Sequence, residues 1–150
     1  MDAGREAAGF EFGSDGPSRL VVGVDGSETS WRALYYAFGL ARRQRSTVIA
    51  VFAIAREQTL AGFPGAAAEA GEELVAELRA AVTALSAEHD VVAEFVCARR
   101  DPVLSLIEVA VERQADAIII GASTSLSHKL FGSNAVRTVR RSKCPVTVVP

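Results

Sequence analysis

The sequence predicts an α/β fold, a single doubly wound parallel sheet covered by helices on both faces. One observation predicts the fold class, and a second predicts a single domain. Short, nearly continuous apolar runs alternate along the chain with longer segments whose apolar residues recur at helical spacing. Such alternation is typical of strand–helix–strand units, in which the helices cover the sheet. The length of 150 residues and the hydrophobic share of 49% fit one domain with its own core.

The ordered domain is expected over residues 19–150. Residues 1–18 hold scattered glycines and charges without a hydrophobic period, so we predict a flexible N-terminal tail there. Leu20–Val24 is an apolar run that fits a strand buried on both faces. The turn residues Asp25–Ser27 end it, and Ser30–Arg43 then predicts a helix from its apolar spacing.

The rest of the chain repeats this pattern at lengths typical of strands and helices. Pro102 suits the first turn of a helix, because its missing N–H would lack an intrahelical partner there anyway. In chain order we expect a strand at Thr47–Ala53, a long loop at Arg56–Ala68, a helix at Glu72–Glu88, a strand at Val91–Cys97, a helix from Pro102, a strand at Ala117–Ile120, a helix at Asn134–Arg141 and a fifth strand at Val146–Val149.

Composition and charge argue against several classes of protein. The formal net charge of -2 gives no basic field for nucleic acid or an anionic membrane. No apolar run reaches the ~18 to 20 residues that a membrane span needs. Asp2, Glu6, Glu11 and Asp15 interrupt any signal-peptide core, so we expect a cytoplasmic protein. No Cys or His cluster has the spacing of a zinc site.

Candidate binding residues lie where strands end, because ligands of such sheets bind beyond the carboxyl ends of the strands. The loop from Gly121 to Ser133 is rich in small polar residues and leads into a helix, whose unpaired N–H groups and positive dipole end favour phosphate. The alternative is that Gly121 only ends a strand and Ser133 only caps a helix. Asp25 could bind a ribose hydroxyl or a phosphate-held metal, or it could form an Asx turn.

From Leu20 to Pro150 the chain resembles the universal stress protein family. The resemblance rests on three short pieces in order: Val21–Ser27, Ala115–Gly121, and the end from Gly132–Ser133 through Cys144–Val149. It implies a sheet of strand order 3-2-1-4-5, homodimers, and ATP bound through a motif of the form G-x2-G-x9-G-[ST]. A binding and signalling role in stress response follows from the same resemblance.

The family's functional residues carry over by position. Gly121 matches the first glycine of the motif, Gly132 and Ser133 match its final pair, and Asp25 matches the acidic residue after the first strand. Ala53 matches the strand end that meets the adenine edge through its backbone. The cofactor implied is ATP, with Mg. With their chain neighbours, the expected nucleotide-binding residues are Gly23, Val24, Asp25, Ala53, Ile120, Gly121, Ala122, Ser123, Thr124, Gly132, Ser133, Asn134 and Ala135.

The motif departs from the family pattern at two points. Thr124 stands where the second glycine should be, and the interval from there to Gly132 is two residues shorter than the pattern. A Cβ at this position restricts the backbone and narrows the space for phosphate. The alternative function is therefore a dimeric interaction module that does not bind ATP and has a degenerate nucleotide pocket.

An efficient enzyme is not expected. The exit of the first strand lacks the Ser-Gly-Gly run of a pyrophosphatase-type loop, and Val96–Ala98 lacks the aspartate of a phosphoacceptor receiver. No nucleophile elbow of the hydrolase type is present in the sequence. We therefore predict a binding protein without efficient turnover.

Three smaller expectations concern the C-terminal third of the chain. A basic cluster around the last helix predicts a solvated face, with the alternative that Lys129 or Arg137 neutralises phosphates. Val146–Val149 is apolar and expected at the sheet edge, so it predicts a homodimer through this strand. Cys97 and Cys144 are expected at opposite edges of the implied sheet, too far apart for a disulfide. The cluster consists of Lys129, Arg137, Arg140, Arg141 and Lys143.

Overall fold

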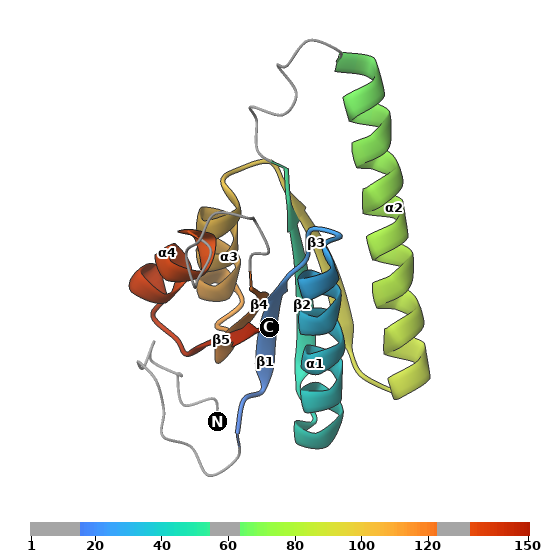
Figure 1. The fold of residues 1–150 in the computed structure, drawn as a ribbon. Coiled ribbons are helices and arrows are strands. Elements are labelled where there is room, and N and C mark those ends of the chain that lie inside the picture. Colours follow the sequence, from blue (N-terminus) through green and yellow to red (C-terminus); the bar gives the residue numbers. More distant parts are fainter. Residues whose placement is uncertain (1–15, 55–63, 123–132) are drawn as a thin grey trace.

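A single sheet of parallel strands in the order β3-β2-β1-β4-β5 forms the centre of the molecule (Figure 1). The computed structural model describes residues 16–54, 64–122 and 133–150, with the side chains of all of these except 64–70. The strand order is the one that the family resemblance implied, and the parallel pairing confirms the predicted fold class. The strands are β1 (Arg19–Gly23), β2 (Thr47–Ala53), β3 (Ala93–Ala98), β4 (Ala117–Gly121) and β5 (Val146–Val149).

Helices cover both faces of this sheet, as predicted. The helices α1 and α2 lie on one face and α3 and α4 on the other (Figure 1). This arrangement leaves the loops that follow the strands at one edge of the sheet, where each strand ends. The helices are α1 (Glu28–Gln44), α2 (Pro64–His89), α3 (Pro102–Glu112) and α4 (Ser133–Arg141).

The largest correction to the predicted elements concerns α2. The sequence predicted a loop through Ala68 and a helix from Glu72, whereas the helix begins at Pro64. Pro64 and Gly65 read as loop residues in sequence, but a proline fits the first turn of a helix and the alanines that follow favour helix. The remainder of the predicted loop, from Arg56 to Phe63, lies outside the described residues.

The other boundaries differ from the predictions by one or two residues. The strand β1 ends at Gly23 rather than Val24, and β3 covers Ala93–Ala98 rather than Val91–Cys97. Val91 is nevertheless buried, and the carbonyl of Val92 accepts a hydrogen bond from Val48 N–H, so both residues belong to the packed domain. The helices α1 and α4 each begin slightly earlier than predicted.

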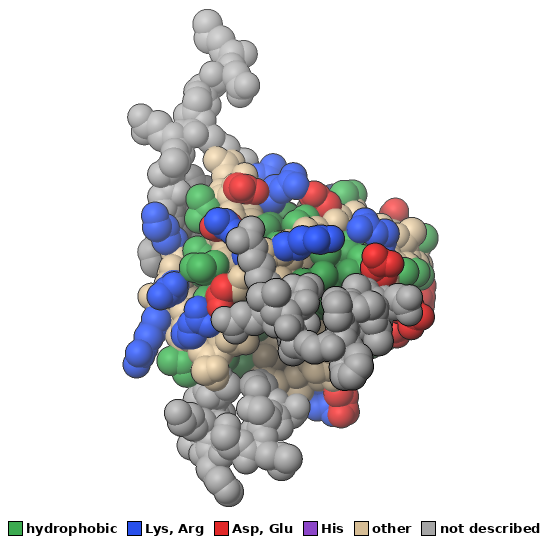
Figure 2. Space-filling view, turned by 90° about the horizontal axis from the view of Figure 1, so that it is seen from above, with side chains coloured by type: hydrophobic (Ala, Val, Ile, Leu, Met, Phe, Trp, Pro, Cys, Tyr) green, Lys and Arg blue, Asp and Glu red, His purple; other side chains and the backbone are tan. Residues whose placement is uncertain are grey.

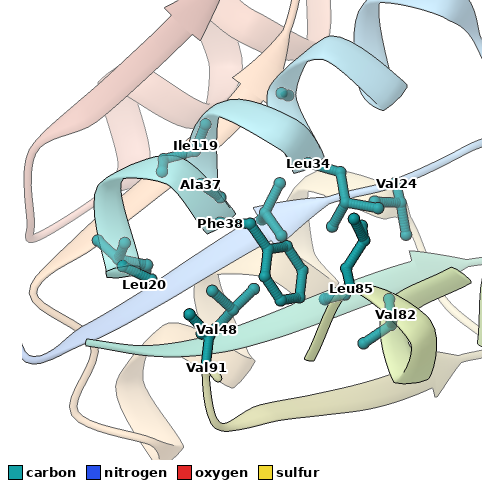
Figure 3. Packing of buried hydrophobic residues seen from close by; sticks show 14 of the residues in the cluster. Leu20, Val24, Leu34, Ala37, Phe38, Val48, Val82, Leu85, Val91 and Ile119 are labelled. Carbon is teal, nitrogen blue, oxygen red and sulfur yellow. The ribbon is translucent and has the colours of Figure 1, made fainter. Parts of the chain in front are cut away.

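The α1–α2 face holds the larger part of the core. The fully buried Phe38 of α1 lies against the sheet between Val48 of β2 and Leu85 of α2 (Figure 3). Burying one such aromatic side chain contributes about 2 to 3 kcal/mol to stability. Leu34 extends the same packing toward Val24, at the end of the sheet where α1 begins (Figure 3). The first turn of α1 is therefore held against the carboxyl edge of the sheet.

Alternation along the strands explains why their sequences are apolar throughout. In β1, Leu20 and Val22 belong to the core under α1 and α2, whereas Val21 belongs to the core under α3 and α4. In β4, Ile119 faces the first core, while Ile118 and Ile120 face the second. Successive side chains of a strand point to opposite faces, so a sheet covered on both faces needs uninterrupted apolar runs.

The N-terminal end of the domain is tied down just before β1. Ser18 N–H donates to the Asp116 carboxylate at 2.8 Å, and Ser18 C=O accepts from Thr47 N–H at 2.9 Å. Of the predicted tail, residues 1–15 lie outside the described residues. Within the described part of the chain, no helix is long and apolar enough to cross a membrane.

Candidate functional site

A hollow of about 240 Å³ opens at the carboxyl edge of the sheet, where β1 and β4 lie side by side. After β1 the chain continues into α1 on one face of the sheet, while α3 and α4 lie beside the hollow on the other face (Figure 1). This is the place where the strand order reverses, and ligands of doubly wound sheets bind at such a point. Figure 2 looks down on this edge, around which basic and acidic side chains are interspersed.

Most of the predicted site residues line the hollow. Ser133 begins α4 but is not among the lining residues. Ser123, Thr124 and Gly132 lie outside the described residues, so the predicted effect of Thr124 stays a prediction. The predicted residues that the structure brings together here are Gly23, Val24, Asp25, Ala53, Ile120, Gly121, Ala122, Asn134 and Ala135.

Sequence reasoning missed a further set of lining residues. Pro102 and Val103 come from the first turn of α3, and they could have been found because β3 also ends at the carboxyl edge. Thr138 lies one turn after Asn134 in α4, a spacing that places both on one face of the helix. The other missed lining residues are Ser27, Thr29, Ser30, Val51 and Leu106.

Asp25 organises the start of α1. Its Oδ1 accepts from Ser27 N–H at 2.8 Å, and Ser27 Oγ accepts from Ser30 N–H at 3.3 Å as the N-cap of α1. The backbone N–H of Asp25 donates to Ser30 Oγ at 3.2 Å. The Asx-turn interpretation of Asp25 is therefore confirmed. The side chain stays exposed at the rim of the hollow, where a carboxylate can accept further hydrogen bonds.

Close packing explains why residue 121 is a glycine, which the sequence alone did not show. A Cβ built there would lie 2.5 Å from the carbonyl carbon of Thr29 and 2.7 Å from Ser30 N. The end of β4 thus lies directly against the backbone of the first turn of α1, at a separation that only glycine allows. This close approach, rather than space for an anion, is what the described residues show for Gly121.

The backbone of Ala53 points into the hollow. Along β2, Thr47 N–H donates to Ser18 C=O and Val51 C=O accepts from Val24 N–H, so the odd-numbered residues direct their polar groups toward β1. Ala53 shares this orientation, because the backbone groups of a parallel strand alternate in direction. The strand β1 ends at Gly23. The N–H and C=O of Ala53 therefore face the lined space beyond β1, where they can meet the polar edge of a planar ligand.

An ion pair joins the start of α3 to the middle of α4. Asp101 is the N-cap of α3, and its Oδ1 accepts from Val103 N–H at 3.0 Å and Leu104 N–H at 3.1 Å. Arg137 of α4 donates to both carboxylate oxygens at 3.1 Å. The Leu104 N–H, and then the Arg137 guanidinium, lower the pKa of Asp101, although partial burial works in the opposite direction.

This pair corrects the prediction for one member of the basic cluster. Arg140, Arg141 and Lys143 are exposed, which fits a solvated face. Arg137 instead belongs to the Asp101 ion pair, a partner 36 positions away that helical spacing could not indicate. Lys129 lies outside the described residues.

The chemistry of the hollow follows from its lining. Asp25 is the one ionisable side chain among the described lining residues. Thr138 is fully buried, and its hydroxyl donates to Asn134 C=O at 2.7 Å. The described residues contain no group of three or more His, Cys, Asp or Glu that could hold a metal ion. Cys97 and Cys144 are free thiols near opposite edges of the sheet.

Comparisons with known proteins agree with this geometry. Residues 17–150 match the universal stress protein family. A universal stress protein of Methanocaldococcus jannaschii is 28% identical over 141 residues, which cover 87% of this chain and 81% of the relative. The structure of universal stress protein UspA from Lactobacillus plantarum superposes with a TM-score of 0.74 at 17% identity, covering 89% of this chain and 97% of that chain.

Two similar structures contain adenine nucleotides. A universal stress protein solved in complex with cAMP superposes with a TM-score of 0.68 at 27% identity, covering 89% of this chain and 96% of that one. The universal stress protein from Archaeoglobus fulgidus, solved in complex with dAMP, superposes with a TM-score of 0.65 at 23% identity, covering 88% and 97%.

Proposed function

The chain belongs to the universal stress protein family, and from this premise we propose that it binds an adenine nucleotide, ATP with Mg among them, in the hollow between β1 and β4. It acts in the stress response as a binding or signalling module. The observation that carries the proposal is the position of the hollow at the strand-order switch, with the start of α4 on its wall. The similar structure bound to cAMP supports the same ligand class.

The lining fits the base and ribose of such a ligand. Val51, Val103 and Leu106 supply apolar surface for a planar ring. The N–H and C=O of Ala53, which face the hollow, can pair with the polar edge of adenine. The exposed Asp25 carboxylate can accept a hydrogen bond from a ribose hydroxyl while it keeps its bond to Ser27.

The phosphate end of the ligand belongs beside the start of α4. Asn134 and Ala135 lie in its first turn and line the hollow. The N–H groups of a first helical turn lack intrahelical partners, and the helix dipole is positive there, so both favour phosphate. Bound Mg would neutralise part of the phosphate charge.

An affinity measurement on a charge variant tests the proposal. Asn134→Asp places a negative charge in the first turn of α4, where an acidic side chain favours the helix but repels phosphate. We expect wild type to bind ATP, AMP and cAMP in calorimetric titration, and Asn134→Asp to lose about tenfold in ATP affinity, on the order of 1.4 kcal/mol. The adenosine affinity should change far less.

Gln114→Glu is the matched control. It makes the same amide-to-carboxylate change at an exposed residue just before β4, at the amino ends of the strands and away from the hollow. We expect wild-type affinity in this variant. A wild-type protein that binds none of these ligands at millimolar concentration would overturn the proposal. An equal loss in both variants would overturn the placement of the phosphates at α4.

We further propose that the bound nucleotide is not turned over efficiently. Asp25 is the one ionisable side chain among the described lining residues, and we assign it to a ribose hydroxyl rather than to the phosphates. A general base needs a free lone pair within hydrogen-bond reach of the attacking water. The described lining thus offers apolar, hydroxyl and amide groups for binding, and Asp25 is its one ionisable group.

A second copy of the chain is the proposed partner, through the edge strand β5. Ile118 N–H donates to Pro145 C=O and Ala122 N–H donates to Val149 C=O, so the odd-numbered residues of β5 bond toward β4. By alternation, Val146 and Val148 present their backbone groups at the free edge. An apolar edge strand with available backbone groups favours pairing with another strand.

A further inference from the structure

The Asp101–Arg137 ion pair joins the start of α3 to the middle of α4, and both helices contribute residues to one wall of the hollow. Asp101 immediately precedes the lining residues Pro102 and Val103 of α3. Arg137 lies in α4 next to Thr138, which lines the hollow with Asn134 and Ala135 one turn earlier. The pair therefore connects α3 and α4, the two helices whose separation sets the shape of this side of the hollow.

The geometry of the pair fixes both distance and orientation. Each guanidinium nitrogen donates to a different oxygen of Asp101, at 3.1 Å in both cases. The carboxylate is held in turn by the N–H groups of Val103 and Leu104. A bidentate arginine–carboxylate contact is directional as well as strong, so a carboxylate anchored to the α3 backbone constrains where α4 can lie.

The other ion pairs among the described residues do not link two different helices. Arg100–Glu108 joins the loop before α3 to α3 itself. Arg32–Glu28 lies within α1, and its side chains are 54% and 78% exposed. Arg113–Glu94 joins α3 to β3 at the opposite end of the helix. The side chains of Arg137 and Asp101 are 40% and 35% exposed, close to the 45% and 42% of Arg113 and Glu94, so what distinguishes this pair is that it links two helices beside the hollow.

We propose that Asp101 and Arg137 are positioning residues for nucleotide binding, which set the separation between the start of α3 and the middle of α4 without contacting the ligand themselves. This inference rests on the proposed function. It assigns Arg137 a role different from that of a phosphate ligand, because the guanidinium is already engaged by a carboxylate that anchors α3. Loss of the pair lets α4 move relative to α3, and the base and phosphate subsites then no longer match one ligand.

Substitution of each partner distinguishes a positioning role of Arg137 from direct contact with phosphate. Asp101→Asn keeps the helix cap, since asparagine caps as well as aspartate, but removes the charge that holds Arg137. If Arg137 positions α4, both Asp101→Asn and Arg137→Gln should weaken ATP and AMP binding by a similar factor, about threefold to tenfold. If Arg137 contacts phosphate, Asp101→Asn releases it and ATP binding becomes tighter.

The measurement is calorimetric titration of wild type, both single variants and the double variant with ATP and AMP. The double variant should lose no more affinity than either single variant, because the partners act as one unit. Arg113→Gln is the control, since it removes an arginine from a similarly exposed ion pair away from the hollow; it should bind as wild type does.

Hydrogen exchange of the nucleotide-free proteins provides the second readout. We expect both single variants to exchange faster than wild type in α4, while exchange in α1 stays at the wild-type rate. Tighter ATP binding by Asp101→Asn, or a loss in Arg137→Gln confined to ATP, would overturn the positioning role alone. A wild-type protein that binds neither nucleotide would instead overturn the proposed function, and unchanged exchange in α4 would overturn the structural part of the inference.

Discussion

Replacing Gly121 by alanine should destabilise the fold at the edge that carries the hollow. An added Cβ would lie 2.5 Å and 2.6 Å from the carbonyl carbon and oxygen of Thr29, and 2.7 Å from Ser30 N. All three are backbone atoms in the first turn of α1, so no side-chain rotation can relieve the overlap. The end of β4 and the start of α1 must separate instead.

The size of this effect follows from the overlap. Ordinary contact begins near 3.4 Å, so relief requires a shift of roughly 1 Å between two packed elements. Overpacking of this kind costs about 3 kcal/mol, the upper end of the usual range, because the neighbours are backbone atoms. For 150 residues that free energy corresponds to a melting temperature lower by about 10 °C.

Gly39→Ala is the matched control for this substitution. Gly39 lies in α1 and is exposed, and a Cβ added to it would meet no heavy atom within 4 Å. Alanine there should stabilise the protein by about 0.5 to 1 kcal/mol, since glycine is a poor helix former. Thermal and urea unfolding followed by circular dichroism should give shifts of opposite sign. A Gly121→Ala protein as stable as wild type would refute the argument that this glycine exists for close packing.

Three further predictions concern charge, assembly and turnover. The lowered pKa of Asp101 means that its contribution to stability is present above the ordinary carboxyl pKa of about 4 and is lost as pH falls through the folded-state pKa. The gap in unfolding free energy between wild type and Asp101→Asn should therefore shrink between about pH 5 and pH 2, whereas parallel curves would contradict the assigned shift. Val148→Pro removes an N–H at the free edge of β5, so it should convert a homodimer seen by sedimentation to monomer; a monomeric wild type would argue against the proposed interface. Phosphate release at saturating ATP and Mg should stay well below about 1 per second, and a rate at or above that value would require a catalytic group not identified in the hollow.

The sequence predicted the sheet well because burial on both faces leaves a strong signal. The runs Leu20–Val24 and Ala117–Ile120 are apolar without interruption, since their alternate residues belong to two cores. The start of α2 was predicted wrongly because Pro64 and Gly65 are typical of loops, and the helix propensity of the following alanines outweighs them. Local propensity did not show which tendency would prevail.

The candidate site was predictable in position but only partly in mechanism. Strand ends identified Gly23, Asp25 and Gly121, because parallel strands end at one edge. The contact between Gly121 and the α1 backbone, and the pairing of Asp101 with Arg137, join residues far apart in sequence. Such tertiary contacts leave no period or motif in a single sequence, so helical spacing could only suggest a solvated face for Arg137.

An NMR titration tests the central claim most directly. Isotope-labelled protein is titrated with AMP, and the backbone amide signals are followed. Binding in the hollow predicts shifts that gather at Asp25, Ala53, Ala122 and Ala135, while the signal of Asp116 at the amino edge of the sheet stays unchanged. Unchanged spectra at millimolar AMP, or shifts confined to the amino edge, would contradict the account.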